Sequence, residues 1–208
     1  MEKAKSLEDF RMPRWRELPA VSLYLEQVLE LLEDCLGPYL GSGERKVMTR
    51  TMINNYVKLR FIAPPVGRKY DRLTVASLFV IAVLKPVYTM EEIRYLIRLS
   101  IGYSDTEAAY DSFCDCVEAA VSHAFHRTAM EKTPDEGDPR QLLWNACNAF
   151  ACQLYVRRIY LEDAMAAGQE QEADATAHDA AEAREDAVPA HEPAGKQEAG
   201  RKGGVRNG

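Results

Sequence analysis

The pattern of hydrophobic and polar positions along the 208-residue chain predicts a series of helices. In the N-terminal part, Ser22 is placed to cap a first helix, and Gly37-Pro38 is expected to end it. Apolar residues recur on one face of this helix at Leu25, Val28, Leu29, Leu32 and Leu36. An amphipathic helix with its apolar face turned toward a core is therefore expected here.

Five further helices are expected along the chain. A short helix at 49–59 precedes an almost wholly apolar one at 72–85, which Pro86 stops. Thr89-x-x-Glu92 predicts a capping box at the start of the next helix, with Ile93, Leu96 and Ile97 facing inward. Ser104 or Asp105 starts a longer helix to about Met130, with Phe113, Val117, Val121 and Phe125 on one face. After a break, Pro139 suits the first turn of a last helix to 162, which carries Leu143, Ala146, Phe150 and Leu154.

The helix expected at 49–59, capped by Thr49, carries an unusual polar stripe. Its positions i, i+3, i+4 and i+7 are Thr51, Asn54, Asn55 and Lys58. The opposite side of this helix is expected to point into a core and carries Met52, Ile53, Tyr56 and Val57. Asn can bond adenine bidentately, and Thr and Lys can reach bases or phosphates. The stripe therefore predicts a DNA-recognition helix, although a solvated face with unconnected asparagines is the alternative.

A basic turn follows this helix. Residues 63–70 contain Pro64-Pro65, a glycine and Arg68-Lys69-Tyr70, which predicts a short hairpin. Basic residues on such a hairpin commonly contact phosphates, and taken alone they would be an ordinary charged turn. In the helix–hairpin context we expect Arg50, Arg68, Lys69 and Tyr70 to hold the DNA backbone.

This combination resembles the winged helix-turn-helix of MerR-type transcription regulators. The residues that carry the resemblance are Thr49, Ile53, Tyr56, Phe61-Ile62, Pro64-Pro65, Arg68-Lys69-Tyr70, the helix at 72–85 and Thr89-Met90-Glu91-Glu92-Ile93. A closer resemblance, over roughly residues 18–101, is to the bacterial family called domain of unknown function 1836. It is carried by the segments LPAVSLYLEQVLELLE and TRTMINNYVK. The resemblance implies a mainly α fold with a winged helix-turn-helix core, and a role in binding double-stranded DNA.

The resemblance implies two further features. MerR-type proteins usually place Gly after the recognition helix, where a left-handed residue is needed, and Arg60 occupies that position here. We therefore expect backbone strain at Arg60 if the geometry is the same. MerR-type proteins also dimerise through helices after the winged domain. The helices at 104–130 and 139–162 are the candidates for a homodimer contact, as a helical bundle or dimer cap.

The charge of the chain is unevenly distributed. The formal net charge is −6, but residues 162–208 contain 11 acidic and 5 basic residues, so residues 1–161 are neutral. Residues 44–72 contain 8 basic and 2 acidic residues, which gives a local positive region. Composition and pattern together predict an N-terminal arm (1–17), a winged domain (18–103), a helical extension (104–164) and a disordered acidic tail (165–208).

No segment of the sequence predicts secretion or membrane insertion. The N-terminus lacks an apolar signal region, and the apolar run Leu73–Leu84 is shorter than the roughly 20 residues that a membrane span needs. Five cysteines, an odd number, are typical of free thiols in a reducing cytosol. The sequence therefore predicts a cytoplasmic protein.

The candidate chemical sites favour structural roles. Cys114-x-Cys116 with His123 and His126 suggests zinc, but residues two apart on a helix point about 200° away from each other. We interpret these thiols, with Cys147 and Cys152, as structural. No phosphate-binding glycine loop, nucleophile elbow or HExxH motif is present, so neither an enzyme nor a cofactor is expected. A protein-interaction adaptor that keeps the winged fold is the alternative to a DNA-binding regulator.

Overall fold

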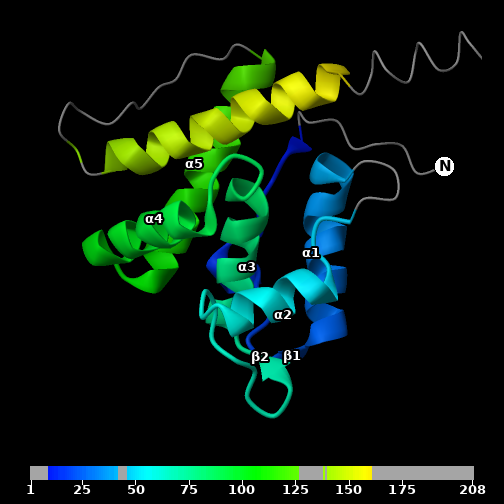
Figure 1. Ribbon diagram of the computed structural model, residues 1–208. Coiled ribbons are helices and arrows are strands. Elements are labelled where there is room, and N and C mark those ends of the chain that lie inside the picture. The colour runs from blue at the N-terminus through cyan, green and yellow to red at the C-terminus, as the bar shows by residue number, and fades with distance from the viewer. Residues whose placement is uncertain (1–8, 42–45, 127–137, 139, 161–208) are drawn as a thin grey trace, which may run out of the picture. The chain divides into compact units, whose positions relative to one another are not determined.

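The computed structural model describes residues 9–41, 46–126, 138 and 140–160. The chain divides into two compact units, Met1–Leu161 and Glu162–Gly208, and all the described residues belong to the first. Within them the protein is mainly helical with one small antiparallel sheet (Figure 1). The mainly α class is thus confirmed. The tail predicted at 165–208, residues 127–130 of the long helix and Pro139 lie outside the described residues.

Helix α3 (Arg72–Leu84) lies in the centre of the first unit. Its N-cap is Asp71, whose Oδ1 accepts a hydrogen bond from the Thr74 N–H at 2.8 Å. Nine of its 13 residues are buried, and the face that carries Leu73, Ser77 and Val80 is less buried than the rest. The prediction of a buried helix at 72–85 is confirmed, because a helix without a polar face is stable only when other elements surround it.

Helix α1 (Leu25–Leu40) continues through the predicted stop at Gly37-Pro38, so that prediction was wrong. The buried Tyr39 lies in the last turn, where its hydroxyl donates to the carbonyl of Asp9 at 2.7 Å. Its ring packs edge-on against Phe10, with centroids 4.9 Å apart. Pro38 removes one N–H from the helix, but these tertiary contacts hold the turn that follows it.

The start of α1 also differs from the prediction. Its N-cap is Tyr24 rather than Ser22, because strand β1 (Leu23–Tyr24) precedes the helix directly. Strand β1 pairs in antiparallel fashion with β2 (Lys69–Tyr70), in the register Leu23↔Tyr70 and Tyr24↔Lys69. This sheet ties the beginning of α1 to the segment that precedes α3.

The predicted helix starts of the C-terminal half agree with the structure. In α4 (Met90–Tyr103), Thr89 and Glu92 form the capping box, with the Thr89 N–H donating to Glu92 Oε2 at 2.8 Å. Helix α5 (Thr106–His126) is capped by Asp105, which accepts from the Ala108 N–H at 2.9 Å. Residues 140–160 form a further helix. Of its four expected inward positions, Ala146, Phe150 and Leu154 are buried and Leu143 is half-buried.

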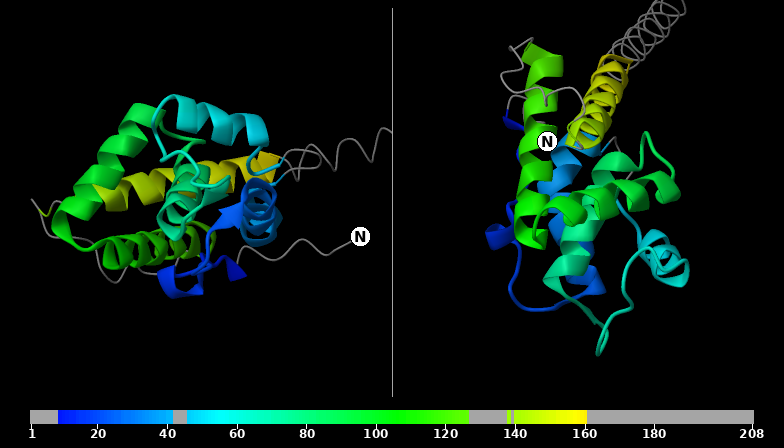
Figure 2. Two further views of the ribbon diagram at one scale, coloured as in Figure 1. Left: turned by 90° about the horizontal axis from the view of Figure 1, so that it is seen from below. Right: turned by 90° about the vertical axis from the view of Figure 1, so that its left-hand side faces the viewer.

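The N-terminal segment packs against α5 instead of standing apart as an arm. Met12 and Leu18 are fully buried, and the short helix η2 (Trp15–Glu17) contacts α5. Figure 2 shows this segment with α5 on the opposite side of α3 from helix α2 (Arg50–Lys58). Residues of the predicted arm, winged domain and helical extension therefore contribute to one hydrophobic core.

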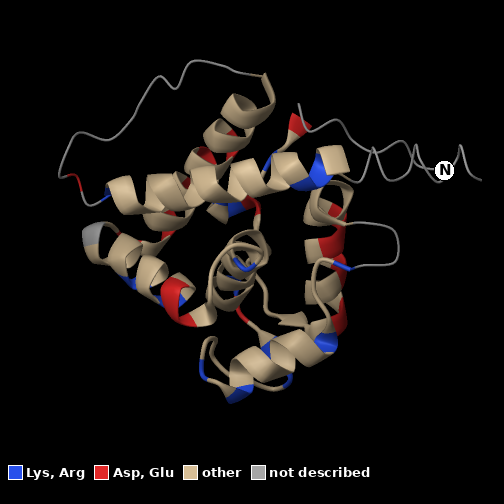
Figure 3. Ribbon diagram, turned by 45° about the horizontal axis from the view of Figure 1, so that its top comes forward, with Lys and Arg blue, Asp and Glu red and all other residues tan. Residues whose placement is uncertain are grey.

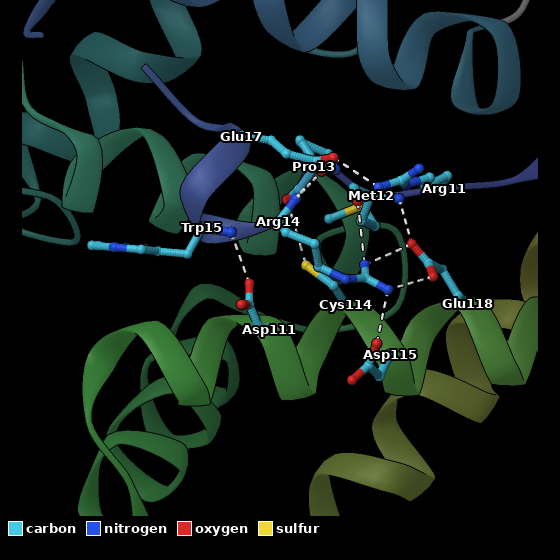
Figure 4. Close-up of polar contacts among 10 residues, drawn as sticks. All are labelled: Arg11, Met12, Pro13, Arg14, Trp15, Glu17, Asp111, Cys114, Asp115 and Glu118. Atoms are coloured by element: carbon cyan, nitrogen blue, oxygen red, sulfur yellow. Dashed lines mark hydrogen bonds and ion pairs between the residues drawn. The ribbon is translucent and has the colours of Figure 1, made fainter. Parts of the chain in front are cut away.

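A set of charged hydrogen bonds fixes this segment, as Figure 4 shows. Arg14 donates to Glu118 at 2.7 and 2.8 Å and to Asp115 at 2.7 Å. The carboxylate of Glu118 also accepts from the Met12 N–H at 2.7 Å. The hydrogen bonds to Glu118 are the main reason that the pKa of Arg14 lies above its ordinary value. These contacts were not predicted. The spacing of Asp111, Asp115 and Glu118, four and three residues apart, places three carboxylates on one face of α5 and could have indicated a basic partner.

Candidate DNA-binding face

Helix α2 has the cap and the orientation that the sequence predicted. The Oγ1 of Thr49 accepts a hydrogen bond from the Met52 N–H at 3.3 Å. Ile53 and Tyr56 are buried in the core. The four stripe residues Thr51, Asn54, Asn55 and Lys58 are all exposed. The division of α2 into an apolar and a polar face is therefore confirmed.

The polar stripe of α2 is available for contact. Within the part of the chain that the structure describes, none of its four side chains makes a hydrogen bond or an ion pair. Asn is a weak helix former, so adjacent asparagines at 54 and 55 lower the stability of the helix without a compensating contact. The structure of the described residues therefore gives no stabilising reason for the two asparagines, which leaves their amides open to a ligand.

The C-terminal end of α2 is closed by a turn with a left-handed residue. The Arg60 N–H donates to the carbonyl of Val57 at 3.0 Å, and the Phe61 N–H donates to the carbonyl of Tyr56 at 2.8 Å. These two bonds form a Schellman motif, which requires a left-handed residue at its C′ position. That residue is Arg60, with φ 56°. The strained conformation expected at Arg60 is confirmed.

Arg94 of α4 holds this turn from outside. Its Nη2 donates to the carbonyls of Leu59 and Arg60, each at 3.3 Å. Its guanidinium also lies 4.1 Å from the centre of the Phe61 ring, in a cation–π contact. Arg94 therefore couples α4 to the end of α2. No local sequence pattern indicated this role, because Arg94 is 34 residues from its partner Arg60.

The predicted hairpin is present as a tight turn. Val66 and Lys69 exchange two backbone hydrogen bonds, at 2.9 and 3.0 Å. The two residues between them, Gly67 and Arg68, both have positive φ, at 57° and 66°. This is the combination that a type I′ turn requires. The tip is open to solvent, with Val66 86% exposed and Arg68 also exposed.

Three of the predicted backbone-contacting residues have other roles. Tyr70 is only 4% exposed and belongs to the core, and burial raises the pKa of its hydroxyl. It therefore cannot serve as a surface contact, contrary to the prediction. Lys69 is half-buried, with its ammonium 4.8 Å from the centre of the Tyr24 ring. Arg50 forms an exposed ion pair with Glu26 of α1.

The charge around α2 and the hairpin is positive. From Lys46 to Tyr70 the sequence contains six basic residues and no acidic one. Figure 3 shows blue and no red along α2. Acidic residues begin on the adjoining α1, where Glu26 pairs with Arg50. The face formed by the stripe of α2 and the hairpin Val66–Lys69, called the α2–hairpin face below, therefore attracts anions.

Four of the five cysteines are buried or half-buried, as expected of structural thiols, whereas Cys152 is exposed, contrary to the prediction. Cys114 is buried and donates to the carbonyl of Pro13 at 3.7 Å, and burial raises the pKa of its thiol to about 12. Cys147 is buried as well, and none of the five cysteines, which all lie among the described residues, forms a disulfide. Among the described residues, no group of three or more His, Cys, Asp or Glu side chains could hold a metal ion. None of the described helices is both long and apolar enough to cross a membrane.

These observations define the class of the protein as a mainly helical domain with a small antiparallel sheet and an exposed basic helix. Residues 13–113 match the family described as Domain of unknown function (DUF1836). The match supports the family that the sequence resemblance indicated. It covers just under half of the chain and includes the α2–hairpin face, Arg94 and the Trp15–Asp111 hydrogen bond at 2.7 Å. No curated protein and no solved structure matches the chain.

Proposed function

We propose that the protein binds double-stranded DNA as a transcription regulator. In this proposal α2 is the recognition helix, and the hairpin Val66–Lys69 is the wing of a MerR-like winged helix-turn-helix. The observation that carries the proposal is the exposed and unpaired stripe Thr51, Asn54, Asn55 and Lys58, next to a basic hairpin. An enzymatic role has no comparable support.

The dimensions and chemistry of the face suit a major groove. Helix α2 is exposed on its polar side, and an α-helix with its side chains is about 10–12 Å across, which a major groove about 12 Å wide admits. Asn54 and Asn55 lie in its second turn and can donate to and accept from an adenine edge. Lys58 and Arg68 can contact phosphates on either side of the groove.

A second copy of the chain completes the proposal. Regulators of this kind usually read two half-sites one helical turn apart, which requires a dimer. One face of the helix at 140–160 has the alternating three- and four-residue spacing of a coiled-coil seam. Its residues are the half-buried Ala149 and the exposed Leu142, Asn145, Cys152, Val156 and Ile159. We propose that two copies pack along this face.

The decisive experiment compares Asn54→Ala and Asn55→Ala with the wild-type protein. DNA fragments bound by the wild type are first selected from random sequence. We expect each variant to bind the selected site about 5- to 150-fold more weakly, since a bidentate contact is worth about 1–3 kcal/mol. Binding to unrelated DNA should change little, because basic residues provide it. The quantity to measure is the ratio of specific to nonspecific affinity at one salt concentration.

Two controls make the result clear. Circular dichroism should show both variants folded, because Ala is the better helix former at these exposed positions. Gln141→Ala, exposed on the helix at 140–160, should leave the ratio unchanged. An unchanged ratio in both asparagine variants would remove α2 as the reader of bases. If the wild type selects no DNA at any salt concentration, the interaction-module hypothesis replaces this proposal.

A further inference from the structure

Arg60 combines a strained backbone with an exposed cationic side chain. Its φ of 56° lies in the left-handed region, where any residue with a Cβ is disfavoured and glycine is not. A glycine at this position would form the same Schellman turn with less strain. Residues held in such conformations are concentrated at functional sites, so the choice of arginine here needs a reason.

The neighbouring structure imposes this conformation. Two backbone hydrogen bonds close the turn, from Arg60 to Val57 and from Phe61 to Tyr56. Arg94 adds two donors to the carbonyls of Leu59 and Arg60, and its guanidinium stacks on Phe61. Arg94 is thereby occupied with backbone and ring contacts. It positions the turn, and its own charge is not presented to a ligand.

The side chain of Arg60 has no comparable task. It is exposed, and among the described residues it makes no hydrogen bond, ion pair or ring contact. It follows Lys58, the last residue of the polar stripe, by two positions. One structural explanation remains, namely the attraction of a cation to the negative end of the α2 dipole. That explanation predicts that loss of the side chain destabilises the protein.

We infer that Arg60 is a phosphate-binding residue of the α2–hairpin face, and that Arg94 is its positioning residue. The inference rests on the proposed DNA-binding function and extends it to two residues. The arginine is retained at a left-handed position because its charge at the end of α2 contacts the DNA backbone. A guanidinium suits this contact, since it binds phosphate oxygens through two parallel hydrogen bonds.

The test is the variant Arg60→Gly, which relieves the strain and removes the charge. We expect its melting temperature to stay the same or rise. Its affinity for DNA should fall about equally for selected and unrelated sequences. The plot of log affinity against log salt concentration should become shallower by about 0.9, the value for one lost phosphate contact. A merely structural residue would not change this slope.

Three further variants complete the experiment. Arg60→Lys keeps the charge and should keep the slope. Arg16→Ala removes a charge from the η2 side, which contacts α5, and should also keep it. Arg94→Met should expose the Arg60 and Phe61 amides to faster hydrogen exchange, whether or not DNA is present. It should also reduce the specific affinity by disturbing the turn.

The possible failures are distinguishable. If the wild type binds DNA but Arg60→Gly keeps the wild-type slope, Arg60 is not a phosphate contact, and the proposed function stands without it. A fall in the melting temperature of Arg60→Gly would favour the helix-dipole explanation. Unchanged amide exchange in Arg94→Met would remove Arg94 as the positioning residue. Absence of DNA binding by the wild type would overturn both the function and this inference.

Discussion

At the scale of single residues, Glu118 joins the N-terminal segment to α5. Its carboxylate accepts three hydrogen bonds of 2.7–2.8 Å, two from the Arg14 guanidinium and one from the Met12 N–H. The two side chains are 25% and 23% exposed, so solvent screens their attraction only in part. Glu118 therefore attaches the N-terminal segment to α5.

Replacing Glu118 by Gln should destabilise the protein by about 1.5–3 kcal/mol, the range for hydrogen bonds to a charged group. The amide has nearly the same shape but loses the charge and one acceptor. Urea unfolding followed by circular dichroism measures the free energy of unfolding. Asp115→Asn is the matched control, because Asp115 is 71% exposed and bonds the same arginine only once. Equal losses in both variants would show that the burial of Glu118 adds nothing.

At the scale of secondary-structure elements, the hairpin Val66–Lys69 and the end of α2 present the same feature. Each contains an arginine with positive φ, Arg68 in a type I′ turn and Arg60 in a Schellman turn. Both turns would accept glycine more readily. Strain is thus distributed over the two elements of the α2–hairpin face, where the proposed phosphate contacts lie.

For the hairpin, Arg68→Gly should leave the melting temperature unchanged or slightly higher, since Gly suits both central positions of a type I′ turn. We expect nonspecific DNA affinity to decrease, and the salt dependence to become shallower by about 0.9 for the one lost contact. Titrations at several salt concentrations provide the measurement. Arg68→Lys should retain the wild-type salt dependence. Identical curves for wild type and Arg68→Gly would exclude the hairpin from the interface.

At the scale of the whole molecule, the two proposed contact surfaces lie at opposite ends of the first unit. Figure 1 shows the hairpin and the helix at 140–160 (yellow) at opposite ends of the core, with α3 between them. The right-hand view of Figure 2 shows the same separation. The proposed dimer seam therefore leaves the α2–hairpin face uncovered, so that a dimer can present two such faces to DNA.

The variant Val156→Asp tests this arrangement. Val156 is 66% exposed, so an aspartate there should not disturb the fold of one chain, but it would place a charge in the proposed seam. We expect sedimentation analysis to show a dimer for the wild type and a monomer for Val156→Asp. Gln141→Glu, exposed on the same helix but outside the seam, should remain dimeric. A wild type that is monomeric at all concentrations would contradict the seam.

The sequence by itself determined the features that depend on near neighbours. The structure agrees with the predicted Thr49 cap, the two-faced pattern of α2, the Thr89–Glu92 capping box and the almost wholly apolar α3. Each depends on residues within a few positions of one another. Side-chain capping and helical periodicity are local effects, and for this reason they can be read directly from the sequence.

Only the tertiary structure decided the features that depend on distant partners. Contacts of Tyr39 with Phe10 and Asp9 carry α1 past Pro38, and packing places Tyr70 in the core. Glu118 bonds Arg14 across 104 positions, and Arg94 holds Arg60 across 34. No local pattern contains such pairings, since they form only when the core brings these segments together. The polar stripe of α2 could therefore be predicted from the sequence, whereas the Arg94 contacts that fix the end of α2 could not.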